Sequence, residues 1–234
     1  FHAVKGFISG AAPLAEETMR KFGESFKRGK LLQGYGISEC SPVVSTNVPW
    51  SNRIGSVGQA LPSYQVECFD EQMQPVARDV IGEICVKGDC VMLGYFNRPN
   101  DTAEAIVDGW FRTGDIGKVD KDGFIYILDR KKDLIISKGM NIYPREIEEI
   151  IYTHDKVNAC AVVGVRDLEA NETPVAYIEL KEDISATEAE IKDFIRPHLA
   201  PFKQPRKIIF MEKLPRNATG KILKRELREL ANKT

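Results

Sequence analysis

The sequence is poor in the residues that build metal sites and disulfide frameworks. Only three of its 234 residues are histidine, and its five cysteines (Cys40, Cys68, Cys85, Cys90 and Cys160) form no CxxC pair. A structural zinc site needs tighter clustering of such ligands. The pattern favours free thiols in a reducing compartment.

Long apolar runs are also missing. The longest ones fall far below the roughly 20 residues that span a bilayer, and the first residues do not form a signal peptide. The chain opens with Phe1-His2-Ala3, without an initiator Met, and passes directly into a strand-like run. We therefore expect a piece of a longer protein located in the cytoplasm, with peripheral contact to the membrane left open.

Two common nucleotide-binding signatures are absent. No GxGxxG follows a strand, and no GxxxxGK[ST] loop is present because Pro215 stands where its first glycine would be. The net charge of -1 argues against general nucleic-acid binding. Only residues 203–234 are basic, with ten Lys or Arg against three Asp or Glu. Such a stretch is typical either of a solvated helix face or of a site for an anionic ligand.

What is present falls into two regions of different pattern. In the first, Lys5–Ile8 predicts a strand, and Pro13 predicts the first turn of a helix that has Met19, Phe22 and Phe26 on one face. Further strands and a hairpin turn follow: Gln65–Phe69, Gly82–Lys87, the turn Asp122-Gly123, and Phe124–Leu128. This density of strands predicts a small β-barrel or a strongly bent sheet. Asp101 and Glu104 predict a capping box for a helix at Thr102–Val107.

After Arg130-Lys131-Lys132-Asp133 the pattern becomes that of a compact β/α unit of about 100 residues. Three helices are predicted: one that begins at Pro144 with Ile147, Ile150 and Ile151 on a face, one capped by Ser185 and Glu188, and one marked by Leu223, Leu227 and Leu230. Strands are predicted at Ala159–Val165, Val175–Leu180 and Lys207–Met211. The charged tetrad at 130–133 is a plausible hinge.

Four segments carry more chemistry than plain structure requires: Gly34–Glu39, Arg112–Asp115, Ser137–Asn141 and Pro215–Lys221. Glycines allow close approach of the backbone, and a tyrosine ring offers a stacking face. The carboxylate of Glu39 can hold a hard cation such as Mg²⁺, and that of Asp115 can accept from two ribose hydroxyls or merely cap a turn. Each segment taken alone also fits a Gly-rich turn or a loop with a solvated lysine.

The order of these segments resembles that of the motifs in acyl-adenylate-forming enzymes. The matching segments are Ser9–Pro13, Gly34–Glu39, Trp110–Asp115, Asp129–Lys132, Lys138–Glu148 and Pro215–Lys221. Within that superfamily, Glu39–Val44 and Asn141-Ile142-Tyr143-Pro144 look most like the C-terminal part of AMP-forming long-chain fatty acid–CoA ligases. The resemblance implies an α/β plus α+β fold: a truncated large domain that ends in a small β-barrel-like subdomain (1–131), then a small C-terminal α+β lid domain (132–234).

The resemblance also implies an activity and its residues. Such enzymes join a fatty acid to ATP, giving acyl-AMP and pyrophosphate, and coenzyme A then displaces AMP. The nucleotide-binding residues would be Gly10, Ala11, Ala12, Gly34, Tyr35, Gly36, Ser38, Asp115 and Arg130. Among them Tyr35 would stack on adenine, and Asp115 would hold the ribose with Arg130 assisting. Glu39 would bind Mg²⁺, and Lys221 would be the catalytic lysine.

In the second half-reaction the C-terminal domain would swing about Lys132 and present the coenzyme A loop, with Lys138, Gly139 and Asn141. Two departures from the family pattern are mild: Ser38 replaces a usual Thr, and Ala170-Asn171-Glu172 lacks a usual glycine. The family's phosphate loop and most of its acyl tunnel precede the residues seen here. We therefore expect this chain alone not to catalyse adenylation, and we expect the missing half of the enzyme as a partner.

Other interpretations stay open. The chain can be a non-catalytic binding module, although the motif lysine and acids are intact. It can belong to an aryl-CoA ligase or a carrier-protein acyl-AMP ligase, because most pocket residues lie upstream. Nucleic-acid binding through the basic tail lacks the aromatic residues that such sites interleave with charge. A homodimer is neither favoured nor excluded.

Overall fold

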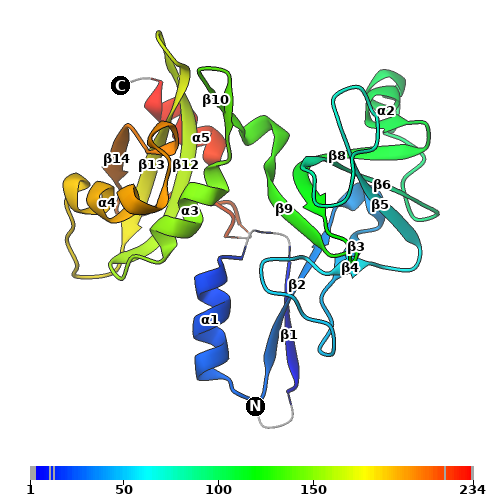
Figure 1. Ribbon diagram of the computed structural model, residues 1–234, viewed down its shortest axis with the longest axis horizontal. Helices are drawn as coiled ribbons and strands as arrows, with labels where there is room; N and C mark the ends of the chain where they lie inside the picture. The colour runs from blue at the N-terminus through cyan, green and yellow to red at the C-terminus, as the bar shows by residue number, and fades with distance from the viewer. Residues whose placement is uncertain (1–3, 11, 13, 219, 233–234) are drawn as a thin grey trace. The chain divides into compact units, whose positions relative to one another are not determined.

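The structure, a computed structural model, describes residues 4–10, 12, 14–218 and 220–232. The chain divides into two compact units, Phe1–Lys131 and Lys132–Thr234. Each unit has its own sheets and its own buried core (Figure 1). Within the described residues, no helix combines the length and the apolar character needed to cross a bilayer.

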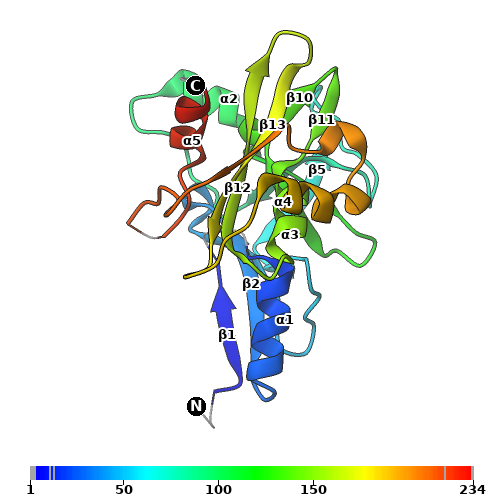
Figure 2. The ribbon, with the colours of Figure 1, turned by 90° about the vertical axis from the view of Figure 1, so that its left-hand side faces the viewer.

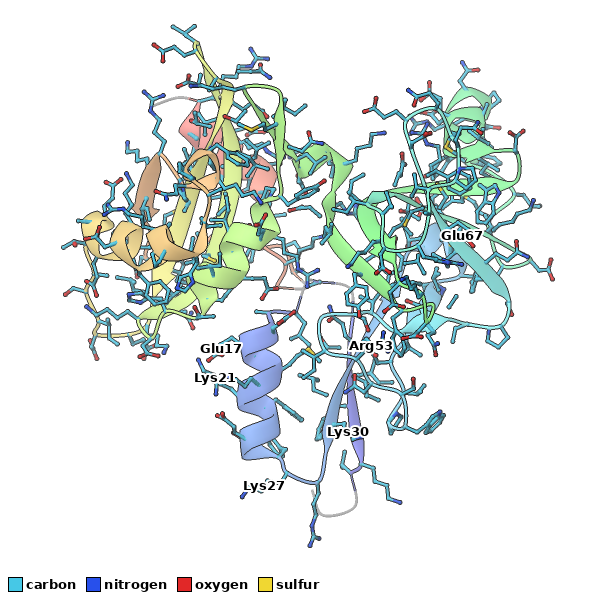
Figure 3. The ribbon with its side chains drawn as sticks, in the orientation of Figure 1. Glu17, Lys21, Lys27, Lys30, Arg53 and Glu67 are labelled. Atoms are coloured by element: carbon cyan, nitrogen blue, oxygen red, sulfur yellow. The ribbon has the colours of Figure 1, made fainter. Side chains whose placement is uncertain are left out.

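The first sheet of unit 1 has the order β1 (Gly6–Ser9), β2 (Lys30–Gly36), β3 (Val43–Thr46) and β4 (Gln59–Ala60). Strands β1 and β2 are parallel, so the chain needs a crossover between them, and α1 (Glu16–Ser25) provides it. The predicted apolar face of α1 is confirmed in part. Met19 is buried, but Phe26 is the C-cap and is 40% exposed, with its ring stacked on that of Phe22 at a centroid distance of 4.8 Å. Its other side is charged, where Glu17 and Lys21 pair at 3.1 Å (Figure 3). Pro13 lies outside the described residues.

The second sheet of unit 1 is antiparallel and curled, in agreement with the predicted barrel-like or bent sheet. Its strands are β5 (Tyr64–Phe69), β6 (Gly82–Gly88), β7 (Ile106–Val107), β8 (Trp110–Val119) and β9 (Ile125–Arg130). Register shifts interrupt the pairing of β8 with both β6 and β9, and such irregularities bend a strand. A Cβ on Gly117 would lie 2.2 Å from the carbonyl oxygen of Tyr126, so the tight β8–β9 pairing requires glycine there.

The predicted capping box of Asp101 and Glu104 is wrong. Helix α2 (Pro99–Ala105) begins earlier, at a proline whose fixed φ suits the first helical position. The Asp101 carboxylate instead accepts a hydrogen bond from Arg98 at 2.7 Å. The helix also ends before Ile106, because Ile106 and Val107 pair with β8 as strand β7.

Unit 2 is built on a five-stranded sheet with β13 at its centre. The strands are β10 (Ile135–Ser137), β11 (Met140–Ile142), β12 (Val157–Asp167), β13 (Asn171–Leu180) and β14 (Lys207–Phe210). Helices α3 (Pro144–Tyr152) and α4 (Glu188–Ile195) cover one face (Figure 2), where Ile147 and Ile191 meet Val162. Helix α5 (Lys224–Ala231) packs through Leu227 on the opposite face, against Tyr177 and Leu214. Short 3₁₀ turns complete the chain at Ser38–Cys40, Lys131–Asp133, Arg196–His198 and Pro201–Lys203.

Two details of the predicted helices in unit 2 are wrong. The N-cap of α4 is Thr187, whose side chain accepts from the backbone N–H of Glu190, so the predicted Ser185–Glu188 box does not form. In α5, Leu227 is fully buried, but Leu223 is the N-cap and Leu230 is 45% exposed. Only the middle position of the predicted leucine stripe is therefore core. Asn171 lies in the segment where the family pattern has a glycine. Its φ of 68° is in the left-handed region, which Asn tolerates better than most residues.

Candidate active site

A buried carboxylate, that of Asp115, forms the centre of the predicted nucleotide site in unit 1. The side chain lies in β8 and the residue is 3% exposed. The Tyr35 hydroxyl on β2 donates to its Oδ2 at 2.6 Å, and the Arg130 Nε on β9 lies 3.0 Å from its Oδ1. Three strands thus bring together residues that are far apart in the sequence. A buried carboxylate is costly unless it is paired and hydrogen-bonded, as this one is.

The environment of Tyr35 fixes its protonation state. Burial raises the pKa of its hydroxyl, and the neighbouring charge of Asp115 raises this pKa further. The hydroxyl therefore stays protonated and acts as a donor. The hydroxyl thus orients the Asp115 carboxylate, and the stacking of the ring on adenine stays a prediction.

The glycines beside Tyr35 lie where the backbone is crowded. A Cβ on Gly36 would meet the carbonyl oxygen of Pro42 at 1.8 Å, and one on Gly34 would lie 3.3 Å from that of Ser45. Gly10 directly follows β1, and a Cβ on it would lie 3.6 Å from the Gly34 carbonyl oxygen, which is an ordinary van der Waals contact. Packing of the chain on itself thus explains the glycines at 34 and 36, and the role of these residues toward a nucleotide stays a prediction. Ala12 is exposed, and Ala11 lies outside the described residues.

Glu39 lies in a short 3₁₀ turn directly after β2, together with Ser38. The Tyr95 hydroxyl donates to its Oε1 at 2.9 Å, and the Met92 backbone N–H donates to its carbonyl oxygen at 2.8 Å. The segment around Tyr95 thus orients this carboxylate. No pattern in the sequence predicted this contact.

A Mg²⁺ ion fits this arrangement only if the nucleotide supplies ligands. Among the described residues, no group of three or more His, Cys, Asp or Glu is placed to hold a metal ion. Mg²⁺ is usually bound by one or two carboxylates plus substrate phosphates and waters. The single carboxylate of Glu39 matches that donor set.

The predicted coenzyme A loop is the hairpin between β10 and β11. Lys138 and Gly139 take φ values of 49° and 78°, and Ser137 pairs with Met140. Positive φ at both central residues defines a type I′ turn, for which glycine is well suited. A Cβ on Gly139 would meet nothing within 4 Å, so the space over the turn is open. Asn141, on β11, is exposed. Lys132, the predicted hinge, lies in the 3₁₀ turn Lys131–Asp133 and is exposed as well.

Lys221 lies on a second hairpin of unit 2. Arg216 pairs with Ile222, and the Leu223 N–H donates to the Pro215 carbonyl oxygen at 2.8 Å. The backbone N–H of Lys221 itself donates to the side chain of Asn217 at 2.9 Å. These contacts pair the two sides of the hairpin, 215–217 and 221–223, while Thr219 lies outside the described residues.

The comparisons with known proteins agree with these motifs. The protein-family model described as AMP-binding enzyme matches residues 1–96, and the one described as AMP-binding enzyme C-terminal domain matches residues 146–221. The chain belongs to the AMP-binding enzyme family.

The relatives of this AMP-binding enzyme chain include proteins with different substrates. A long-chain-fatty-acid–CoA ligase of Bacillus subtilis is 45% identical over 97% of the chain, and a 2-succinylbenzoate–CoA ligase of Geobacillus kaustophilus is 43% identical over 86%. The ATP-bound crystal structure of MatB from Rhodopseudomonas palustris is 38% identical, covers 96% of the chain and has a TM-score of 0.90. The chain spans 41% of the length of both ligases and 45% of that of MatB.

Proposed function

We propose that the whole protein that contains this chain is an AMP-forming acyl-CoA ligase acting on fatty acids. One observation carries the proposal: the buried Asp115 carboxylate is held by Tyr35 and Arg130. A carboxylate fixed in this way can accept from both hydroxyls of a ribose. The similarity to CoA ligases and to an ATP-bound structure supports the same conclusion.

In the first half-reaction, a carboxylate oxygen of the fatty acid attacks the α-phosphorus of ATP and pyrophosphate leaves. Two anions approach each other, and we assign Lys221 to stabilise the charge that develops between them. Gly10, Gly34, Gly36 and Ser38 line the nucleotide in this proposal. A Mg²⁺ ion held by Glu39 supplies positive charge to the phosphates when bound.

In the second half-reaction, the thiol of coenzyme A attacks the acyl carbonyl and AMP leaves. We assign the hairpin with Lys138, Gly139 and Asn141 to this step, and Lys132 to the hinge between the two steps. Replacing Lys221 with Ala should therefore lower adenylation by about 10²–10³-fold. The same variant should still convert preformed acyl-AMP and coenzyme A to the thioester. Equal loss of both steps would contradict this assignment.

The test of the proposal is acid-dependent ATP–pyrophosphate exchange and AMP release by the whole protein. Asp115→Asn should weaken ATP use by about tenfold or more, since a hydrogen bond to a charged group contributes about 1.5–3 kcal/mol. Asp122→Asn is the matched control: Asp122 lies in the β8–β9 turn, and its side chain is 68% exposed. Equal effects of the two substitutions would contradict the ribose assignment.

The acid is identified by a panel of fatty acids of different chain length, 2-succinylbenzoate and other aromatic acids, with and without coenzyme A. Strong AMP release with aromatic acids and none with fatty acids would overturn the proposed substrate. The 234-residue chain alone should show no exchange, since it lacks the phosphate loop. Robust turnover by this chain would refute that expectation.

A further inference from the structure

The hairpin that carries Lys221 is anchored at its base by one buried side chain, that of Glu179 in β13. The residue is 7% exposed. The backbone N–H of Leu214 donates to its Oε2 at 3.0 Å, and the Arg216 guanidinium donates to the same oxygen at 2.8 Å. The Asn158 amide on β12 donates to its other oxygen at 2.5 Å. Two of these three donors belong to the segment that leads into the hairpin.

All three partners of Glu179 are donors, so the position requires a group that only accepts. An ionised carboxylate is such a group, whereas a glutamine offers a single oxygen and would turn its NH2 group either toward Leu214 and Arg216 or toward the Asn158 amide. Burial opposes ionisation, but the hydrogen bonds from Arg216, Leu214 and Asn158 outweigh it, and the pKa of Glu179 is lowered. The carboxylate is therefore charged at neutral pH.

We propose that Glu179 is a positioning residue for Lys221: it fixes Leu214 and Arg216 on the sheet and thereby sets where the ammonium group lies during adenylation. The inference rests on the proposed function. The route is short and continuous: Glu179 holds Leu214 and Arg216, Arg216 pairs with Ile222, and Ile222 follows Lys221. A displacement of about 1 Å at a reacting group can cost about 10²-fold in rate.

The experiment compares Glu179→Gln with Glu172→Gln in the whole protein. Glu172 is a matched control because it lies on the same strand and also accepts from a backbone N–H, that of Ile136 in β10 at 2.9 Å. Glu179→Gln should lower the kcat of adenylation by about 10²-fold, with little change in the KM for ATP. It should leave the conversion of preformed acyl-AMP within about twofold, and Glu172→Gln should leave adenylation unchanged.

A second variant guards against loss of folding. Arg216→Met removes one part-buried donor, whose side chain is 31% exposed, and leaves Glu179 the donors from Leu214 and Asn158, so unit 2 should stay folded. Adenylation should fall by about tenfold while the thioester step is kept. Hydrogen exchange gives a readout without activity: the amides of Leu214 and Leu223 should exchange faster in Glu179→Gln than in the control.

The outcomes separate the two proposals. If Glu179→Gln lowers both half-reactions equally, or neither, while Lys221→Ala stops adenylation, then the inference about Glu179 is overturned and the proposed function stands. If the wild type shows no acid-dependent exchange, the proposed function fails. Unchanged exchange of the Leu214 and Leu223 amides in Glu179→Gln would overturn the anchoring whatever the activity.

Discussion

Removal of one hydroxyl should weaken unit 1, because the part-buried Tyr35–Asp115 hydrogen bond ends on a buried, charged carboxylate. In Tyr35→Phe the Asp115 Oδ2 loses a donor at 2.6 Å, although Arg130 remains 3.0 Å from Oδ1. A hydrogen bond to a charged group contributes about 1.5–3 kcal/mol, so the free energy of unfolding of unit 1 should fall by that amount. The ring itself is kept, and no cavity larger than the hydroxyl is left.

The assay is urea unfolding followed by tryptophan fluorescence. Both tryptophans, Trp50 and Trp110, lie in unit 1, so the signal reports on that unit alone. Tyr126→Phe is the control: its hydroxyl donates to Asp120 at 3.3 Å, and Asp120 keeps its other donors from Arg53 and the backbone. The control should lose about 0.5 kcal/mol or less. Asp120 is buried as well, so the two variants differ in the length of the hydrogen bond that is lost. Equal losses would refute the argument that the short bond to Asp115 contributes more than the 3.3 Å bond to Asp120.

Two further predictions concern unit 1. The Glu83 carboxyl is buried, which opposes ionisation, but Arg112 at 2.8 Å and Lys131 at 3.2 Å hold its pKa below 4.5. Because the pKa of Glu83 is lower in the folded state than in the unfolded state, its charge adds stability above pH 4.5, and this stability is lost as the pH falls. Glu83→Gln should therefore flatten the acid side of a profile of unfolding free energy against pH, measured by fluorescence. An unchanged slope would contradict this. Gly117→Ala should lower the stability of the same unit by about 1–3 kcal/mol, since its Cβ meets the Tyr126 carbonyl oxygen, and an unchanged urea midpoint would show that the strands can separate without cost.

Element types were readable from the sequence wherever one face of an element is buried. The stripe of Ile147 and Ile151 in α3 follows the helical period, and the short apolar run Val175–Leu180 marks β13, which is buried on both faces. Helix caps were less readable. Several residues near a helix start can cap it. In the structure Thr187 is the N-cap of α4, and α2 begins at Pro99.

The candidate site was readable only as separate motifs. The order of Tyr35, Asp115 and Arg130 within known motifs suggested a shared nucleotide, but their mutual hydrogen bonds depend on how β2, β8 and β9 approach one another. The contact of Tyr95 with Glu39 was missed for the same reason, because 56 residues separate them.

The sequence by itself determined the family, the element types and the chemical groups, since these depend on residue identity and local period. The tertiary structure alone decided which carboxylates are held and by what: Asp115 by Tyr35 and Arg130, and Glu179 by the base of the Lys221 hairpin. The physical reason is that burial and hydrogen-bond partners are set by strands distant in the chain. No local pattern around Glu179, in a run of apolar strand residues, specifies the donors that it meets.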